Sequence, residues 1–204
     1  IPIFEPASQQ EAYDMAYEGF ELSEKLKIPI MMRITTRLAH SRSGIETRPL
    51  KQENNLKYPE DPIQFVLLPS NARKRYKGLL GLQSLMEQES ERSSFNTYYP
   101  ARNKSLGIIA CGIDFNYLME NYPERKFPHP VLQLGQYPIP FSKVEKIVNE
   151  CEQVLVLEDG YPLVEEMLKG YLDKNSKIKG RLDGTIPRDG ELNPDIVAKA
   201  LGKE

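Results

Sequence analysis

The polar stretch from Thr35 to Ser43 carries the side chains of this chain best suited to substrate chemistry. Arg37 can pair with a carboxylate through its planar guanidinium, and His40 can donate or accept a proton near neutral pH. Ser41 adds a hydroxyl beside them. Ligands of α/β proteins bind at the carboxyl ends of strands, and this stretch directly follows a predicted strand. We therefore predict Arg37, His40 and Ser41 as substrate-facing residues; the alternative is that they cap the strand end at a domain interface.

Other residues of chemical interest favour structural roles. Glu158-Asp159-Gly160 follows an apolar run, where its carboxylates can hold a cation, but turn formation and helix capping before Pro162 is the favoured role. His129 lies between two prolines and is predicted to be a surface loop residue. Cys111 and Cys151 lie in apolar or helical stretches, which favours small buried hydrophobes over reactive thiols.

Several cofactor motifs are missing from the sequence. Two cysteines and two histidines, far apart along the chain, do not supply the ligands of a zinc or iron-sulfur site. The glycine spacing produces neither G-x-G-x-x-G nor a P-loop, and no G-x-S-x-G elbow occurs. Enzymes that hold thiamine diphosphate through Mg²⁺ use a G-D-G motif, and Glu158-Asp159-Gly160 lacks its first glycine. We predict no catalytic residue, cofactor site or metal site within this chain.

Composition and charge exclude some classes of partner. The 204 residues are 40% hydrophobic and 27% charged, as in an ordinary globular protein. The net charge is -2 with basic and acidic residues interspersed, which argues against nucleic acid as a partner. The longest apolar runs fall far short of the roughly 20 residues of a membrane helix. With two isolated cysteines and no signal-peptide pattern, we expect a cytoplasmic location.

The elements that position these residues begin with a capped helix. Ser8 and Glu11 have the S-x-x-E form of a capping box, and near-helical apolar spacing continues until just before Pro29. A buried strand is predicted for residues 28–34, followed by a loop to Pro49 and a linker over residues 51–62. A further strand over 65–68 and one amphipathic helix over 72–92 complete the first half, and this helix is expected to dock between two modules.

The second half shows a regular alternation of strands and helices. Apolar runs over residues 106–111, 131–134 and 154–157 are each followed by a helical pattern, over 114–122, 142–151 and 163–172. Such alternation predicts a mainly parallel sheet covered by helices on both faces. Residues 177–181 can add an edge strand, and Asn193-Pro194 opens a final helix. This half is therefore predicted to be a complete α/β domain.

Three groups of stretches, in this order along the chain, resemble one enzyme family. The first runs from Glu5 to Met15 and on to Ile34–Ser43, the second from Phe65–Arg73 to Leu106–Gly112, and the third comprises Leu132–Gly135, Pro138–Pro140, Val156–Glu158 and Gly190–Pro194. Together they span nearly the whole chain. They resemble the α subunit of indolepyruvate ferredoxin oxidoreductase, within the pyruvate/2-oxoacid:ferredoxin oxidoreductase family.

The resemblance implies a division of the chain and a role for it. Residues 1–45 would be the C-terminal remnant of a thiamine pyrimidine-binding domain, 46–105 a linker, short strand and connecting helix, and 106–204 a transketolase C-terminal-like domain. The parent enzyme would use thiamine diphosphate, Mg²⁺ and 4Fe-4S clusters, with CoA as co-substrate, to convert aryl pyruvates such as indolepyruvate to aryl-acetyl-CoA. Its partners would be the remainder of the α subunit, a β subunit and ferredoxin.

The resemblance further implies an interior fragment that is inactive alone and mainly structural. One helix and one strand cannot bury an apolar face without partners, so residues 1–45 are expected to expose one. Ile1 in place of an initiator methionine fits this interpretation. The alternative is a free-standing α/β ligand-binding or regulatory domain with the same order of elements, and the C-terminal region of a ketoacid dehydrogenase E1 β chain is a poorer fit.

Overall fold

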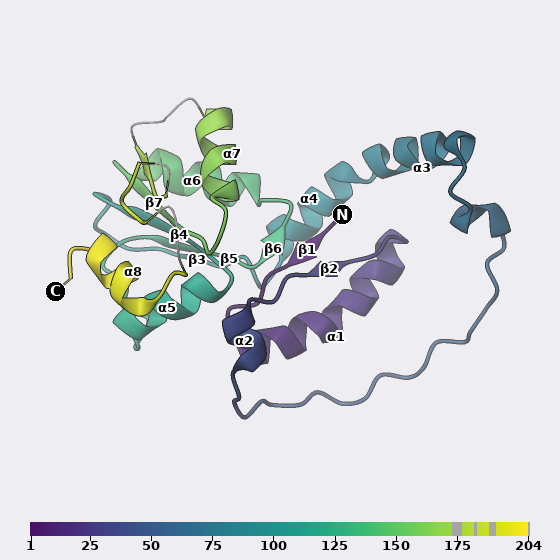
Figure 1. Ribbon diagram of the computed structural model, residues 1–204, viewed down its shortest axis with the longest axis horizontal. Coiled ribbons are helices and arrows are strands. Elements are labelled where there is room, and N and C mark those ends of the chain that lie inside the picture. The colour runs from purple at the N-terminus through teal and green to yellow at the C-terminus, as the bar shows by residue number, and fades with distance from the viewer. Residues whose placement is uncertain (173–176, 182, 188–190, 204) are drawn as a thin grey trace.

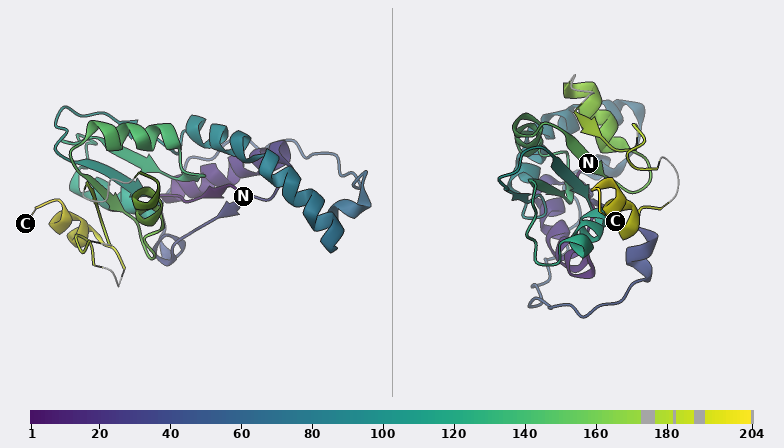
Figure 2. Two further views of the ribbon diagram at one scale, coloured as in Figure 1. Left: turned by 90° about the horizontal axis from the view of Figure 1, so that it is seen from above. Right: turned by 90° about the vertical axis from the view of Figure 1, so that its left-hand side faces the viewer.

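The computed structural model describes residues 1–172, 177–181, 183–187 and 191–203. It contains a C-terminal α/β domain, a smaller N-terminal unit packed against one end of it, and a helical arm that extends away from both (Figure 1; Figure 2). In the part of the chain that the structure describes, no helix combines the length and apolar content needed to cross a membrane. Gly190, the first residue of the stretch Gly190–Pro194 discussed above, lies outside the described residues.

The C-terminal domain is built on a mainly parallel sheet, as predicted. Its described strands follow the order β3-β5-β4-β7-β8, and β3 alone among them is antiparallel to its neighbour. Their bounds are β3 Tyr98–Tyr99, β4 Gly107–Cys111, β5 Val131–Leu134, β7 Val154–Leu157 and β8 Ile178–Lys179. Every residue of β4, β5 and β7 is buried because helices cover both faces of the sheet, which explains the unbroken apolar runs.

Alternate residues of the central strands enter two separate cores. Ile108 and Ala110 pack with helices α5, Ile113–Asn121, and α8, Pro194–Ala200. Ile109 and Cys111 pack on the opposite face with α6, Phe141–Glu150, and α7, Leu163–Leu172. The predicted cap of the last helix is confirmed, since the Ile196 N–H donates to Asn193 Oδ1 at 2.9 Å.

The N-terminal unit consists of β1, Ile3–Phe4, α1, Gln9–Leu26, β2, Met31–Met32, and the short α2, Thr36–His40. Its sheet has the order β2-β1-β6, and β6, Gln136–Tyr137, comes from the C-terminal domain. The cap of α1 is confirmed, because the Glu11 N–H donates to Ser8 Oγ at 3.2 Å. The Glu11 carboxylate accepts the N–H of Ala7, one residue earlier than a standard capping box requires.

The connection between the two halves runs through an exposed segment and two helices. Residues 52–60 are exposed and without secondary structure, and the 3₁₀ turn η1, Pro62–Phe65, leads to α3, Pro69–Gly81, and α4, Gln83–Arg92. Within α3, every residue of which is described, no side chain is buried. By contrast, α4 inserts Met86 into the core formed by Phe4, Met15 and Leu26. Of the predicted long helix, α4 therefore docks between the two halves, and α3 adds the partly buried Leu79 to the same core.

Four local predictions are wrong. The apolar run at 65–68 is no strand but the end of η1 and an exposed connector, because no sheet edge lies beside it. The single helix predicted over 72–92 breaks at Leu82 into α3 and α4. The loop after Thr35 contains α2, and the buried strand over 28–34 shrinks to β2, where Met31 is 50% exposed.

The two halves are in close contact at Gly112, between β4 and α5. Its φ of 48° is left-handed, and an added Cβ would lie 2.4 Å from Cγ of Glu5 in the N-terminal unit. We expect Gly112→Ala to lower the free energy of unfolding by at least about 2 kcal/mol, measured by urea denaturation. Gly78→Ala is the control, because nothing lies within 4 Å of its Cβ position and alanine favours the helix. Equal stability of Gly112→Ala and the unsubstituted chain would contradict this account.

Candidate functional site

The order of the strands creates a crevice at the carboxyl ends of β4 and β7. The chain leaves β4 through α5 toward β5, and it leaves β7 through α7 toward β8, on the other side and the opposite face of the sheet. In open α/β sheets such a switch in direction is where ligands bind. Cys111 ends β4 here, and Glu158 and Asp159 follow β7. This crevice is the candidate functional site.

The N-terminal unit fills much of this crevice. Glu5, whose side chain is 6% exposed, forms an ion pair with Arg33 and accepts a hydrogen bond from Tyr137 Oη at 2.9 Å. Arg33 Nη2 donates to the carbonyl of Asp159 at 3.0 Å, and the Glu5 N–H donates to the carbonyl of Gly135 at 2.8 Å. A cavity of about 220 Å³ remains between the two halves, lined also by Cys111 and Tyr161. The carboxylate of Glu5 and the guanidinium of Arg33 thus pair with each other inside the crevice.

Glu158 has the capping role favoured by its sequence context. Its two carboxylate oxygens accept the backbone N–H groups of Val164 and Glu165 at 2.9 Å each, at the start of α7. Burial raises the pKa of Glu158 to about 7, although these two hydrogen bonds oppose the shift. Arg181 Nε donates to the Glu158 carbonyl at 3.0 Å. The two residues join the turn after β7 to α7 and β8.

Asp114 and Tyr117 on α5 are polar groups that the sequence reasoning did not single out. Both are buried, and neither the Asp114 carboxylate oxygens nor the Tyr117 hydroxyl has a hydrogen-bond partner among the described residues. Burial raises the pKa of Asp114 well above its usual range, the nearby charge of Asp159 raises it further, and the charge of Arg181 offsets this only in part. Burial also raises the pKa of Tyr117 to about 12. The sequence did hold a signal for this site, because Asp114 is the third residue after Cys111, at which the buried strand β4 ends.

The three predicted substrate-facing residues lie on α2 and at its C-cap, in three different environments. Arg37 Nε lies 2.8 Å from Glu191 Oε1, and its guanidinium lies 5.3 Å from the centroid of the Tyr117 ring. Ser41 Oγ donates to the Leu38 carbonyl at 2.6 Å and so helps to end α2. His40 is exposed. Arg37 therefore lies beside α5 at the contact between the halves, and direct contact of all three residues with substrate stays a prediction.

The remaining sequence candidates have ordinary environments. Cys111 and Cys151 are each 2% exposed, and burial raises the pKa of both thiols. His129 is half-buried, with Nδ1 3.4 Å from the carbonyl of Asn103. Across the described residues, no group of three or more histidine, cysteine or acidic side chains could hold a metal ion. The geometry and burial of these residues thus favour a closed contact between the two halves, here called the seam, over an open reaction centre.

Comparison with known proteins identifies relatives of the chain. No family model matches it. The chain is 31% identical over 98% of its length to indolepyruvate oxidoreductase subunit IorA of Methanothermobacter thermautotrophicus, and 33% identical over its full length to the subunit of that name from Pyrococcus horikoshii. The chain belongs to the family of these IorA subunits. It spans 34% of the length of each of these two relatives.

A solved structure supports the fold. The 2-oxoglutarate:ferredoxin oxidoreductase from Magnetococcus marinus, solved with 2-oxoglutarate, coenzyme A and succinyl-CoA bound, matches with a TM-score of 0.63. The match covers 98% of this chain and 41% of that one, at 11% sequence identity. The matched length includes both the N-terminal unit and the α/β domain. The α/β fold with a mainly parallel sheet, expected from the resemblance, is confirmed.

The raised pKa of Glu158 predicts a pH dependence of stability. The folded chain keeps the Glu158 proton up to about pH 7, whereas the unfolded chain loses it near the ordinary value of 4.5. Stability should therefore fall as pH rises between these values, by on the order of 3 kcal/mol from this group. Glu158→Gln does not titrate, and its free energy of unfolding, measured by urea denaturation from pH 4.5 to 7.5, should fall less steeply. Parallel profiles for the two proteins would show that Glu158 does not titrate in this range.

Proposed function

We propose that this chain is part of the α subunit of a thiamine diphosphate-dependent 2-oxoacid:ferredoxin oxidoreductase that converts indolepyruvate-type aryl pyruvates to aryl-acetyl-CoA. The observation that carries the proposal is the match to IorA subunits over 98% of the chain or more. The relative of known structure has the same fold and acts, by its name, on another 2-oxoacid with ferredoxin. Within that enzyme the chain mainly serves structure and assembly.

The proposed division of the chain has residues 1–45 as the end of a pyrimidine-binding domain and 106–204 as a transketolase C-terminal-like domain. Apolar side chains at the free side of the N-terminal unit support this, since Phe20 is 77% exposed, Met31 50% and Ile34 47%. A cavity of about 400 Å³ lies beside them between α1 and β2. β2 is also an edge strand in the described sheet, and its free side can accept a further strand. We infer that the rest of the pyrimidine-binding domain packs there.

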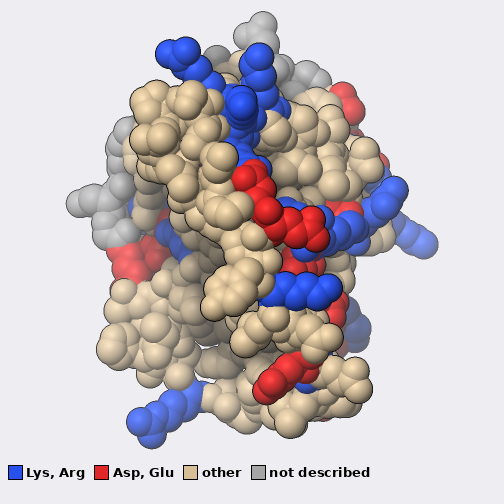
Figure 3. All heavy atoms as spheres, turned by 90° about the vertical axis from the view of Figure 1, so that its right-hand side faces the viewer, with Lys and Arg blue, Asp and Glu red and all other residues tan. Residues whose placement is uncertain are grey.

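The arm between the halves supports an assembly role. Ile63, Phe65, Leu67, Leu68 and Tyr76 on η1, α3 and their connector are all more than half exposed. Figure 3 shows broad uncharged areas among lysine and arginine side chains at this end of the molecule. Exposed apolar surface of this extent marks a protein interface. We propose that it contacts the remainder of the α subunit or a β subunit.

The cofactors of the proposed enzyme would be bound outside this chain. A 4Fe-4S cluster takes cysteine thiolates, and the chain's two cysteines are buried in separate strand and helix positions. The stretch nearest to the Mg²⁺-binding G-D-G motif, Glu158-Asp159-Gly160, lacks its first glycine, and both carboxylate oxygens of Glu158 accept backbone N–H groups of α7. Thiamine diphosphate, Mg²⁺, the clusters and CoA would meet parts of the enzyme beyond these residues, and ferredoxin would accept the electrons.

Assembly of the whole oxidoreductase tests the structural role. Phe20→Ser should leave the stability of the chain itself within about 0.5 kcal/mol, because the side chain is 77% exposed. In the whole enzyme the same change should lower the yield of assembled subunits, measured by size-exclusion chromatography. Leu56→Ser is the matched control, since Leu56 is fully exposed on the connecting segment. Equal yields for both variants would contradict packing of a further domain on this face.

Kinetics of the whole enzyme test the substrate-facing prediction. If Arg37 binds the substrate carboxylate, Arg37→Ala should raise the KM for indolepyruvate about tenfold or more in a ferredoxin-reduction assay. His40→Ala should lower kcat/KM as well. Glu191→Gln is the control, because it removes the partner of Arg37 at 2.8 Å and leaves the guanidinium in place. Unchanged kcat and KM in Arg37→Ala and His40→Ala would leave the loop with a structural role alone.

A further inference from the structure

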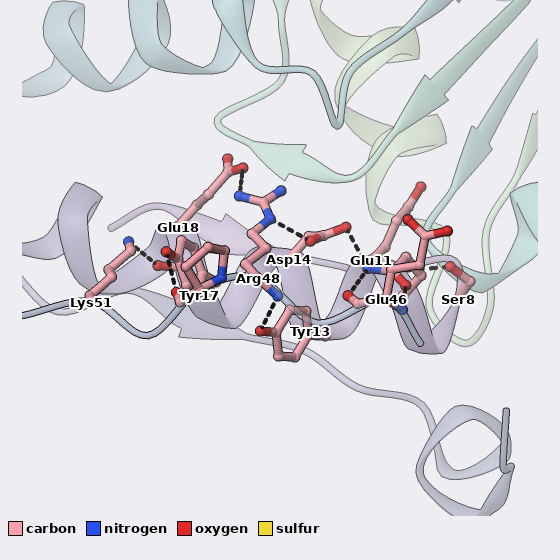
Figure 4. A network of polar contacts seen from close by, with 11 residues as sticks. Ser8, Glu11, Tyr13, Asp14, Tyr17, Glu18, Glu46, Arg48 and Lys51 are labelled. Atoms are coloured by element: carbon pink, nitrogen blue, oxygen red, sulfur yellow. Dashed lines mark hydrogen bonds and ion pairs between the residues drawn. The ribbon is translucent and has the colours of Figure 1, made fainter. Parts of the chain in front are cut away.

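An extended segment of the chain lies along the outer face of α1. Residues 44–51 have no secondary structure, and they run beside α1 in the same direction, with Glu46 near the start of the helix and Lys51 near Glu21 (Figure 4). The polar contacts between the segment and the helix follow a regular pattern. One set consists of hydrogen bonds from α1 side chains to the backbone of the segment, and a second set consists of ion pairs with its basic side chains.

The backbone contacts come from one stripe of α1. The Gln10 side-chain amide binds Glu46 twice, accepting its N–H at 2.8 Å and donating to its carbonyl at 3.1 Å. Tyr13 Oη accepts the N–H of Arg48 at 2.9 Å, and Tyr17 Oη donates to the carbonyl of Pro49 at 3.0 Å. Gln10, Tyr13 and Tyr17 are spaced by three and four residues, so they share one face of the helix. Such contacts align an extended backbone, and they do not by themselves distinguish its side chains.

The side-chain contacts come from a neighbouring acidic stripe. Arg48 Nε lies 2.9 Å from Asp14 Oδ1, and its Nη1 lies 2.9 Å from Glu18 Oε1. Lys51 Nζ lies 2.7 Å from Glu21 Oε1, and 3.9 Å from the centroid of the Tyr17 ring. The carboxylates are spaced by four and three residues, which places them on adjacent turns. Arg48 and Lys51, three residues apart, are thus both paired with this stripe.

Apolar burial contributes little to this attachment. Leu50 is 98% exposed and Ile45 39%, and the ion-paired side chains are themselves partly accessible to water, from 19% for Asp14 to 70% for Glu21. Exposed ion pairs stabilise by no more than about 1 kcal/mol each and weaken with salt. An attachment built only from such contacts is reversible. The next residues, 52–60, are exposed throughout, so release of the segment would lengthen the free connection between the two halves.

We propose that the outer face of α1 is a recognition site for an extended basic peptide with arginine and lysine three residues apart, occupied by residues 44–51 as a reversible latch. The tether supplies an effective concentration in the millimolar range, which keeps the site filled although each contact is weak. The latch also anchors the chain after α2, where Gln9 Nε2 donates to Ser41 Oγ at 2.6 Å. It thereby controls the freedom of both the α2 loop and the connecting segment.

Hydrogen exchange of the 204-residue chain tests the latch. The backbone N–H groups of Glu46 and Arg48 are bonded to α1 side chains, so they should exchange at least about tenfold more slowly than those of residues 52–60. Arg48→Ala should remove this difference, and so should 1 M NaCl, where the Debye length is about 3 Å. Lys57→Ala, a basic residue of the exposed connection, should leave it unchanged. Equal exchange in the unsubstituted chain and in Arg48→Ala would overturn the proposal.

Binding of a separate peptide distinguishes a recognition site from a merely packed loop. A fluorescein-labelled peptide with the sequence of residues 44–51 should bind the Arg48→Ala/Lys51→Ala chain, measured by fluorescence anisotropy in 50 mM NaCl. It should bind the unsubstituted chain at least about tenfold more weakly, because the tethered segment competes. The same peptide with alanine in place of its arginine should lose binding. Absence of binding to the doubly substituted chain, or equal binding of the two peptides, would overturn the recognition site.

Discussion

The buried carboxylate of Glu5 is the interaction on which the arrangement of the two halves depends. A carboxylate removed from water needs compensating partners, or it destabilises the fold. Arg33 supplies the opposite charge from the N-terminal unit, and Tyr137 supplies an O–H donor from the C-terminal domain. Gly112 leaves the space that the Glu5 side chain occupies where β4 passes into α5. These partners are available together only when the two halves are closed on each other.

That closure decides how the crevice at β4 and β7 is used. The same strand order that creates a ligand site in many α/β proteins here receives Glu5 and Arg33 from the N-terminal unit. Both carboxylate oxygens of Glu158 accept backbone N–H groups at the start of α7. The buried Asp114 carboxylate and Tyr117 hydroxyl are the polar groups of the seam that lack hydrogen-bond partners among the described residues. A seam of this kind suits a framework segment of a larger enzyme subunit.

The parts outside the two cores are held by a different kind of force. Helices α5 to α8 cover a sheet whose central strands are fully buried, so burial of apolar area stabilises them. The arm and residues 44–51 instead expose apolar side chains and rest on polar contacts at the surface. Local opening therefore begins in these segments, while the α/β domain opens only with global unfolding.

Local signals in the sequence determined the α/β domain almost completely. Runs such as Val154–Leu157 and caps such as Ser8 and Asn193 act within a few residues, so their structures follow from the types and spacing of neighbours. The apolar run at 65–68 shows the limit, because a strand needs an edge to pair with, and no strand of the two described sheets pairs with this run. Strands β1 and β6 have two residues each and exist through pairing across more than 130 positions. Tertiary structure alone also decided that Arg37 meets Glu191, since a charge finds its partner through the fold rather than along the chain.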